Sequence, residues 1–165
     1  MDEWRDFVLA QAGAAGVLTG LVFVGVSINL QKIVSDPDSG LPGRAAEALI
    51  LLVAVLMMST SLLVPGQGTM LAGAEVLVLG LAAWVWIGAI QLLRIRDWGT
   101  MRPDLRRPLV LRVALGQIAL LTLVAAGIAV LAWGLGGLYL LVVGTNLAIL
   151  VALFDAWVLL VEINR

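Results

Sequence analysis

The sequence predicts an all-α protein, a polytopic membrane helix bundle with five transmembrane helices. Of its 165 residues, 62% are hydrophobic and only 13% are charged, and the mean hydropathy is +1.08. A water-soluble fold of this size could not hide so much apolar surface. The chain also contains five apolar stretches of the length, about 20 residues, that crosses the hydrocarbon core of a bilayer. The bilayer is therefore the expected solvent and partner.

The apolar stretches are separated by clear breaks. The predicted spans cover residues 7–31, 45–64, 70–93, 109–133 and 138–161. Proline and glycine interrupt the chain at residues 36–43 and 65–68, and Gly134–Gly137 predicts a tight hairpin between the last two spans. The sequence has no internal repeat of 20–50 residues and no long polar tail, so residues 1–165 are expected to form a single transmembrane domain.

Small residues recur on one side of the first span. At about 100° per residue, that side holds Gly13, Gly16, Gly20, Ser27 and Gln31. Gly16 and Gly20 have the small-xxx-small spacing at which transmembrane helices approach one another closely. We expect this span to be the central packing helix of the bundle, with its glycine face either packed against another helix or lining a pore.

The distribution of basic residues predicts the orientation. Five spans place nine of the ten lysines and arginines on one side, six of them between residues 94 and 112, and leave only Arg5 on the other side. The positive-inside rule assigns the basic side to the cytoplasm. We therefore expect a multi-pass protein of a bacterial inner membrane, with its N-terminus outside and its C-terminus in the cytoplasm. Arginines in a short loop between two spans are expected to contact lipid headgroups and not nucleic acid.

Charged residues inside spans are costly and point to functional sites. The short hairpin should place Arg112 of the fourth span about one turn from both Asp155 and Glu162 of the fifth. A salt bridge is predicted there. It could fix the register of the two helices, or it could form part of an ion or proton pathway.

Two further acidic residues lie near the ends of spans. Glu47 is one turn from Arg44 and belongs to the same cytoplasmic layer as Arg112, whereas Glu75 begins the third span near the outer face. Because both lie within a turn or two of water, we expect them to be solvated.

The residue types that are missing exclude several chemistries. The sequence has no cysteine and no histidine, so it offers no thiol nucleophile, no serine–histidine pair and few zinc ligands. The acidic turn at residues 36–40 lacks the ligand spacing of an EF-hand loop. We expect no enzymatic activity, no bound metal and no cofactor.

Four runs of the sequence resemble a family of small actinobacterial inner-membrane proteins of unknown function. These runs are residues 14–30, 41–47, 64–67 and 155–163, which are spread over nearly the whole chain. Members are sometimes labelled modulators of a membrane-anchored AAA protease, so the resemblance implies a regulatory role beside another membrane protein. It supplies no catalytic residues.

Residues 18–25, 56–65 and 74–76 also resemble parts of the first three helices of the Orai calcium channels. This resemblance implies a first helix that lines a pore. Ser27 and Ile28 stand where an acidic selectivity residue would be wanted, and Orai channels have four spans with a cytoplasmic N-terminus.

Together these features predict a non-enzymatic integral membrane protein. The first hypothesis is a self-associating channel or conduit for ions or small solutes, built as a homo-oligomer of small-faced helices. The alternative is an accessory or modulator subunit that binds another membrane protein through an exposed small-residue face.

Overall fold

A computed structural model describes residues 2–35, 40–96 and 103–163, with only the backbone for residues 2, 94, 103–106, 108, 162 and 163. The regular structure of this part of the chain is entirely helical. The helices are α1 (Asp2–Ile28), α2 (Leu30–Ser35), α3 (Leu41–Leu62), α4 (Thr69–Arg96), α5 (Pro103–Trp133), the 3₁₀ turn η2 (Gly134–Gly137) and α6 (Leu138–Ile163).

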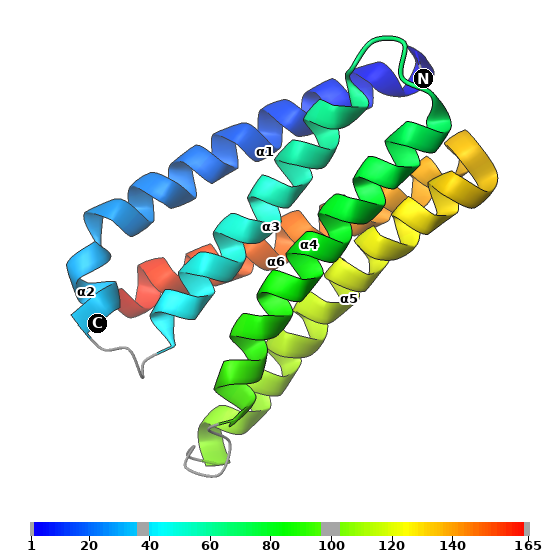
Figure 1. The fold of residues 1–165 in the computed structure, drawn as a ribbon. Helices are drawn as coiled ribbons and strands as arrows, with labels where there is room; N and C mark the ends of the chain where they lie inside the picture. The colour runs from blue at the N-terminus through cyan, green and yellow to red at the C-terminus, as the bar shows by residue number, and fades with distance from the viewer. Residues whose placement is uncertain (1, 36–39, 97–102, 164–165) are drawn as a thin grey trace.

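The long helices are apolar enough to cross a membrane. Four stretches of the described chain meet the requirement of length and hydropathy: Glu3–Ile28, Leu41–Leu62, Thr69–Leu93 and Leu109–Val161. The last stretch has 53 residues and covers most of α5, all of η2 and most of α6, which double back as a hairpin (Figure 1). The predicted bundle of long apolar helices is confirmed.

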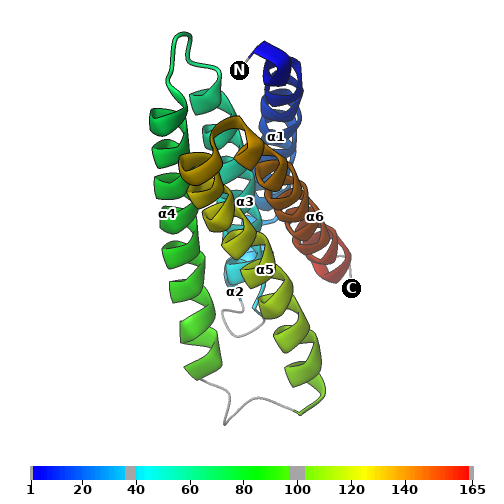
Figure 2. The same ribbon diagram turned by 90° about the vertical axis from the view of Figure 1, so that its right-hand side faces the viewer.

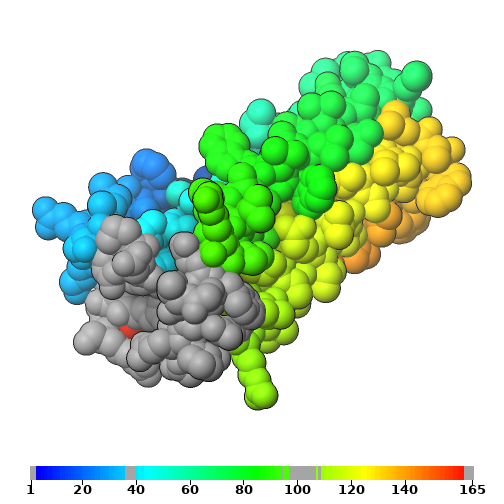
Figure 3. All heavy atoms as spheres, turned by 60° about the horizontal axis from the view of Figure 1, so that its bottom comes forward, coloured from blue at the N-terminus to red at the C-terminus, as the bar shows by residue number. Residues whose placement is uncertain are grey.

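The helices run between two ends of an elongated bundle (Figures 1 and 2). One end, called the N-end below, holds the start of α1, the α3–α4 turn and the η2 turn. The other, the C-end, holds α2, the end of α6, the end of α4 and the start of α5. With the C-end turned toward the viewer, α4 and α5 lie side by side, and α2 lies at the opposite side of the bundle (Figure 3).

Several helices begin or end away from their predicted limits. Helix α3 begins at Leu41 and α5 at Pro103, because proline is tolerated in the first turn of a helix. Helix α1 ends at Ile28 rather than at residue 31. The side-chain amide of Asn29 donates to the backbone carbonyl of Gly25 at 2.9 Å, and this local hydrogen bond competes with continuation of the helix. Helix α2 then runs in a new direction (Figure 1).

The centre of the bundle is α3. It packs against α1, α4 and α6, and its side chains Leu51, Leu52, Val55 and Met58 are at most 1% exposed. In α1, by contrast, few residues are buried, and they lie on one side of the helix: Val8, Gln11, Ala15 and Val22. The prediction that α1 is the central packing helix is therefore wrong.

The glycine face of α1 points away from the bundle. Gly13 and Gly20 are exposed, and a Cβ atom built on either would meet no atom within 4 Å. At Gly16 the nearest atom is Leu56 Cδ1, at 3.8 Å, and Ser27 and Gln31 are exposed. Within the described part of the chain this face is therefore largely uncovered, because α1 instead turns its side with Gln11 toward α3 and α6.

The closest helix contacts use other glycines. A Cβ atom on Gly127 of α5 would lie 2.6 Å from the backbone nitrogen of Leu77 in α4. One on Gly144 of α6 would lie 3.1 Å from the backbone nitrogen of Leu123 in α5. Close helix packing through small residues is thus present, but between α4, α5 and α6.

Candidate functional site

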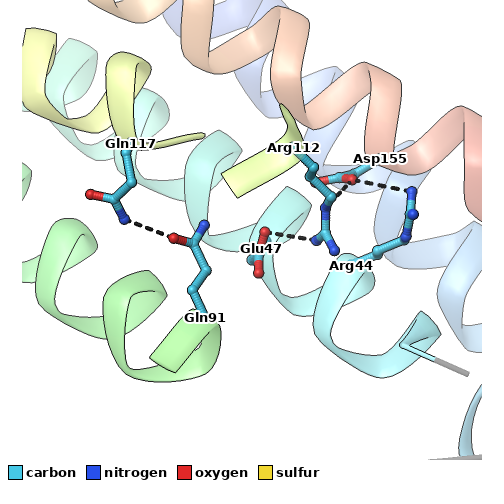
Figure 4. A network of polar contacts seen from close by, with 6 residues as sticks. All are labelled: Arg44, Glu47, Gln91, Arg112, Gln117 and Asp155. Carbon is cyan, nitrogen blue, oxygen red and sulfur yellow. Dashed lines mark hydrogen bonds and ion pairs between the residues drawn. The ribbon is translucent and has the colours of Figure 1, made fainter. Parts of the chain in front are cut away.

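A cluster of charges lies inside the bundle toward the C-end (Figure 4). Arg112 of α5 stands between two carboxylates: its Nη2 atom donates to Glu47 Oε2 of α3 at 2.7 Å, and its Nε atom lies 2.7 Å from Asp155 Oδ1 of α6. Arg44 of α3 approaches the same Asp155 oxygen at 3.8 Å. The cluster therefore ties three helices together.

These charges are withdrawn from solvent. The side chains of Glu47 and Asp155 are 5% exposed and that of Arg112 is 10% exposed, whereas Arg44 is 22% exposed. Two cations and two anions balance formally when all four are ionised. Arg44 is therefore the member with the most exposed side chain, and the cluster is accessible at Arg44.

The α5–α6 hairpin explains the pairing of Arg112 with Asp155. The two residues are equally distant along the chain from the turn near Trp133 and Gly134, so antiparallel helices joined by a tight turn bring them level. The predicted salt bridge is confirmed for Asp155. The side chain of Glu162 lies outside the described residues, so its predicted contact with Arg112 stays a prediction.

The position of Glu47 differs from the prediction. Glu47 is 4% exposed, so the expectation that it is solvated is wrong. It lies on the side of α3 that continues through Leu51 and Val55, both of them buried, and this i, i+4 spacing is the sequence signal that could have placed Glu47 in the interior. Glu75 lies half-buried toward the N-end, where its Oε2 atom accepts a 2.6 Å hydrogen bond from Gln67.

Sequence reasoning missed a chain of amides beside the charges. Trp84 Nε1 donates to Gln117 Oε1 at 2.8 Å, and Gln117 Nε2 donates to Gln91 Oε1 at 2.7 Å. Gln91 is 3% exposed, and its Nε2 atom is buried without a hydrogen-bond partner in the described structure. The nitrogen lies 3.3 Å from where a Cβ atom on Gly116 would be, so the absence of a side chain there makes room for the amide.

A second buried polar group lies nearer the N-end. The Gln11 side-chain amide of α1 donates to Thr145 Oγ1 of α6, and Ser59 Oγ of α3 donates to Gln11 Oε1 at 3.4 Å. All three side chains are at most 8% exposed. No motif in the sequence indicated this cluster, because its three residues lie far apart along the chain.

The two clusters are built on the same pair of helices. In each, a carboxylate or hydroxyl group of α3 and another of α6 are bridged by a residue of a third helix: Arg112 of α5 in the first cluster and Gln11 of α1 in the second. From the helical rise, the clusters are separated by about 18 Å along α3 and about 15 Å along α6.

The layer between the clusters is packed and apolar. The side chains there that are at most 1% exposed are Leu51, Leu52, Val55, Ala148 and Ala152. In the described conformation, this layer separates the polar group near the N-end from the charges near the C-end.

The charged cluster offers groups for ion pairing and proton exchange. The described residues contain no group of three or more histidine, cysteine, aspartate or glutamate side chains that could hold a metal ion. Carboxylates held by an arginine can bind an incoming cation or proton in its place.

Comparison with known proteins identifies no relative: no protein-family model, no curated protein and no solved structure matches this chain. The function proposed below therefore rests on the geometry of the chain itself.

Proposed function

We propose that this chain is an integral protein of a bacterial inner membrane that crosses the bilayer five times and conducts ions or small solutes without enzymatic chemistry. The observation that carries the proposal is the buried cluster of Glu47, Arg112 and Asp155. Charges are expensive inside a membrane bundle, and an ion pair can often be replaced by apolar side chains without loss of stability. Holding helices together does not by itself explain why these positions carry charged side chains.

In the proposed conduit the charged cluster is the exchange site on the cytoplasmic side. Arg44, the most exposed member, contacts Asp155 and gives access from the C-end. A proton or cation that binds Asp155 weakens the ion pair of Asp155 with Arg112. Arg112 then keeps its ion pair with Glu47. Passage toward the N-end further requires that the apolar layer around Leu51 and Val55 open, so the described conformation is the closed one.

Ion flux into proteoliposomes tests this function. The informative variant neutralises the three most buried members of the cluster, with Glu47→Gln, Arg112→Gln and Asp155→Asn combined, because the one charge that remains, on Arg44, is the most exposed of the four. We expect this variant to fold and reconstitute but to lose flux, while Glu75→Gln, which changes a carboxylate near the N-end, keeps it. Wild-type flux in the folded triple variant would refute the role of the cluster.

The proposed topology follows from the basic residues. Arg44, Arg96, Arg107 and Arg112 belong to the half of the bundle near the C-end, which the positive-inside rule places in the cytoplasm. The test uses the absence of cysteine from the sequence. A cysteine at Gly68 should react with an impermeant thiol reagent in intact cells, and one at position 100 only after permeabilisation. The reverse pattern would contradict the orientation.

A second candidate function is favoured by the exposed face of α1. Gly13 and Gly20 leave bare backbone on the outside of the bundle, the form of surface on which a second transmembrane helix can pack closely. That helix can belong to another copy of this chain, as a homo-oligomeric conduit requires, or to a different membrane protein for which this chain is an accessory or modulator subunit. Native mass spectrometry separates the two cases, since the first gives whole-number multiples of the 17.4 kDa chain.

A further inference from the structure

A pocket of about 220 Å³ opens at the N-end of the bundle, away from the charged cluster. The first two turns of α1, residues 62–67 of the α3–α4 turn and Leu138 at the start of α6 form its wall. The buried side chains Val8, Leu62 and Leu138 make it apolar on one side. Its polar side chains are Arg5 and Gln67.

Gln67 offers a hydrogen-bond acceptor that is not used within the described structure. Its Oε1 atom is buried and has no hydrogen-bond partner, while its Nε2 atom donates to Glu75 Oε2 at 2.6 Å. That bond fixes the orientation of the amide, because a flipped amide would place its oxygen against a carboxylate oxygen. A buried acceptor without a partner is costly, and a donor entering the pocket would satisfy it.

The end of α3 adds negative partial charge. The last carbonyl groups of a helix form the negative end of its dipole, and in α3 those of Thr60 and Ser61 accept hydrogen bonds from the backbone N–H groups of Leu63 and Val64. Helix α3 ends at Leu62, and Leu62, Leu63 and Val64 line the pocket. This wall therefore favours a positively charged donor with several N–H groups, which is the chemistry of a primary ammonium.

Arg5 favours a negatively charged group on the ligand. Arg5 lines the pocket, is exposed, and forms no ion pair with another described residue. Arginine binds phosphate strongly through charge-assisted hydrogen bonds. A ligand that suits the pocket thus carries both an ammonium and an anionic group.

The surroundings of the pocket indicate where such a ligand comes from. Trp4 packs edge-to-face against Tyr139, with 4.8 Å between ring centroids, and against Phe7, with 6.1 Å. Tyr139 is 71% exposed, and amphipathic aromatic side chains of this kind gather at the depth of lipid headgroups. The pocket therefore lies at the level where phospholipid headgroups are found.

We propose that this pocket binds a phosphoethanolamine group, with the ammonium toward Gln67 Oε1 and the end of α3 and the phosphate toward Arg5. The group can come from a phosphatidylethanolamine molecule of the bilayer or from a soluble phosphoethanolamine. The site does not depend on ion conduction, so a protein that conducts nothing can still bind this ligand.

Native mass spectrometry of the detergent-solubilised full chain tests the proposal. Dioleoyl phosphatidylethanolamine, phosphatidylcholine and phosphatidylglycerol share acyl chains and phosphate, but only the first has ammonium N–H donors. Because a lost hydrogen bond to a charged group leaves the pocket acceptors unsatisfied, we expect phosphatidylethanolamine to bind about tenfold or more tightly than the other two. Equal binding of the three lipids would overturn the proposal.

Two variants locate the site. Gln67→Leu should reduce the preference for phosphatidylethanolamine over phosphatidylcholine to about twofold or less, whereas Arg5→Gln should weaken both lipids alike. Gln31→Leu makes the same chemical change at an exposed position near the C-end and should keep the wild-type preference. An unchanged preference in a folded Gln67→Leu protein contradicts the proposed site. If that variant does not fold, the comparison of lipids on the wild-type chain still decides.

Competition with soluble O-phosphoethanolamine distinguishes the two sources. Displacement of the lipid at millimolar concentration supports a site that holds the headgroup alone and can take the soluble compound. A preference for phosphatidylethanolamine that soluble phosphoethanolamine does not reduce supports a lipid site in which the acyl chains contribute to binding.

Discussion

Neutralising the charged cluster one residue at a time should give an ordered series of stabilities. Arg112→Gln removes both 2.7 Å contacts and leaves two buried carboxylates near each other, with Arg44 3.8 Å from one of them. Removing one partner of a buried ion pair costs about 3–5 kcal/mol. We expect Arg112→Gln at the upper end of that range. Glu47→Gln and Asp155→Asn should fall at the lower end, because each leaves Arg112 with one carboxylate.

The combinations are more informative than the single changes. Once Arg112 is replaced, Asp155→Asn removes a charge that has lost its closest cation. The double variant should therefore lose less free energy of unfolding than the sum of the losses of the two single variants. The expected coupling is about 1–3 kcal/mol, the upper part of the range for residues in one network. The triple variant with no charge at Glu47, Arg112 or Asp155 should recover most of the loss.

Unfolding in mixed detergent micelles, followed by circular dichroism, measures these differences. Glu75→Gln is the matched control, because Glu75 is only half-buried and an exposed polar pair is worth roughly 0–1 kcal/mol. Wild-type stability for Arg112→Gln, or single-variant losses that simply add, would show that the cluster is solvated and that the reasoning from burial fails.

Other perturbations test the packing and the second polar group. Gly127→Ala places a methyl group 2.6 Å from the Leu77 backbone, so α4 and α5 must separate; we expect a loss of about 1–3 kcal/mol in the same unfolding assay. Gly20→Leu, where no atom lies within 4 Å, should leave the unfolding transition unchanged but lower the assembly mass seen by native mass spectrometry if copies meet there. Gln11→Leu leaves the hydroxyl of Thr145 without the amide and should cost about 1–3 kcal/mol, with weakened protection of the α1 backbone from hydrogen exchange.

Composition and turn residues were sufficient to predict the helical bundle. An apolar run of about 20 residues has few structural solutions, and the breaks at Pro65 and Gly134 end runs that would otherwise continue. The pairing of Arg112 with Asp155 was predictable for a related reason: a tight turn leaves two antiparallel helices only one register. The limits of helices were less predictable, since Pro42 lies inside α3 and Pro103 and Pro108 lie inside α5, although these helices were expected to begin after them.

The glycine pattern of α1 shows what a sequence leaves open. Small residues at i and i+4 show that a helix surface can be approached closely, but they do not identify the helix that approaches it. In this chain Gly127 and Gly144 make close contacts between helices, whereas Gly20 remains uncovered. The side of α1 that does pack carries Gln11, whose hydrogen bond to Thr145 could not be seen from the sequence because the two residues are 134 positions apart.

The placement of charge also separates two forms of the proposed conduit. A path along an axis between copies joined through α1 would be lined by Gly13, Gly20, Ser27 and Gln31, none of which is charged. A path through each subunit would instead pass the buried charges, and in the described conformation it would be closed by the apolar layer. Gly20→Leu should abolish flux in the first case and preserve it in the second, while the triple variant of Glu47, Arg112 and Asp155 should do the opposite. Because the glycine face lies on the outside of the bundle and the charges lie inside it, each variant leaves the other path intact, and one pair of flux measurements distinguishes them.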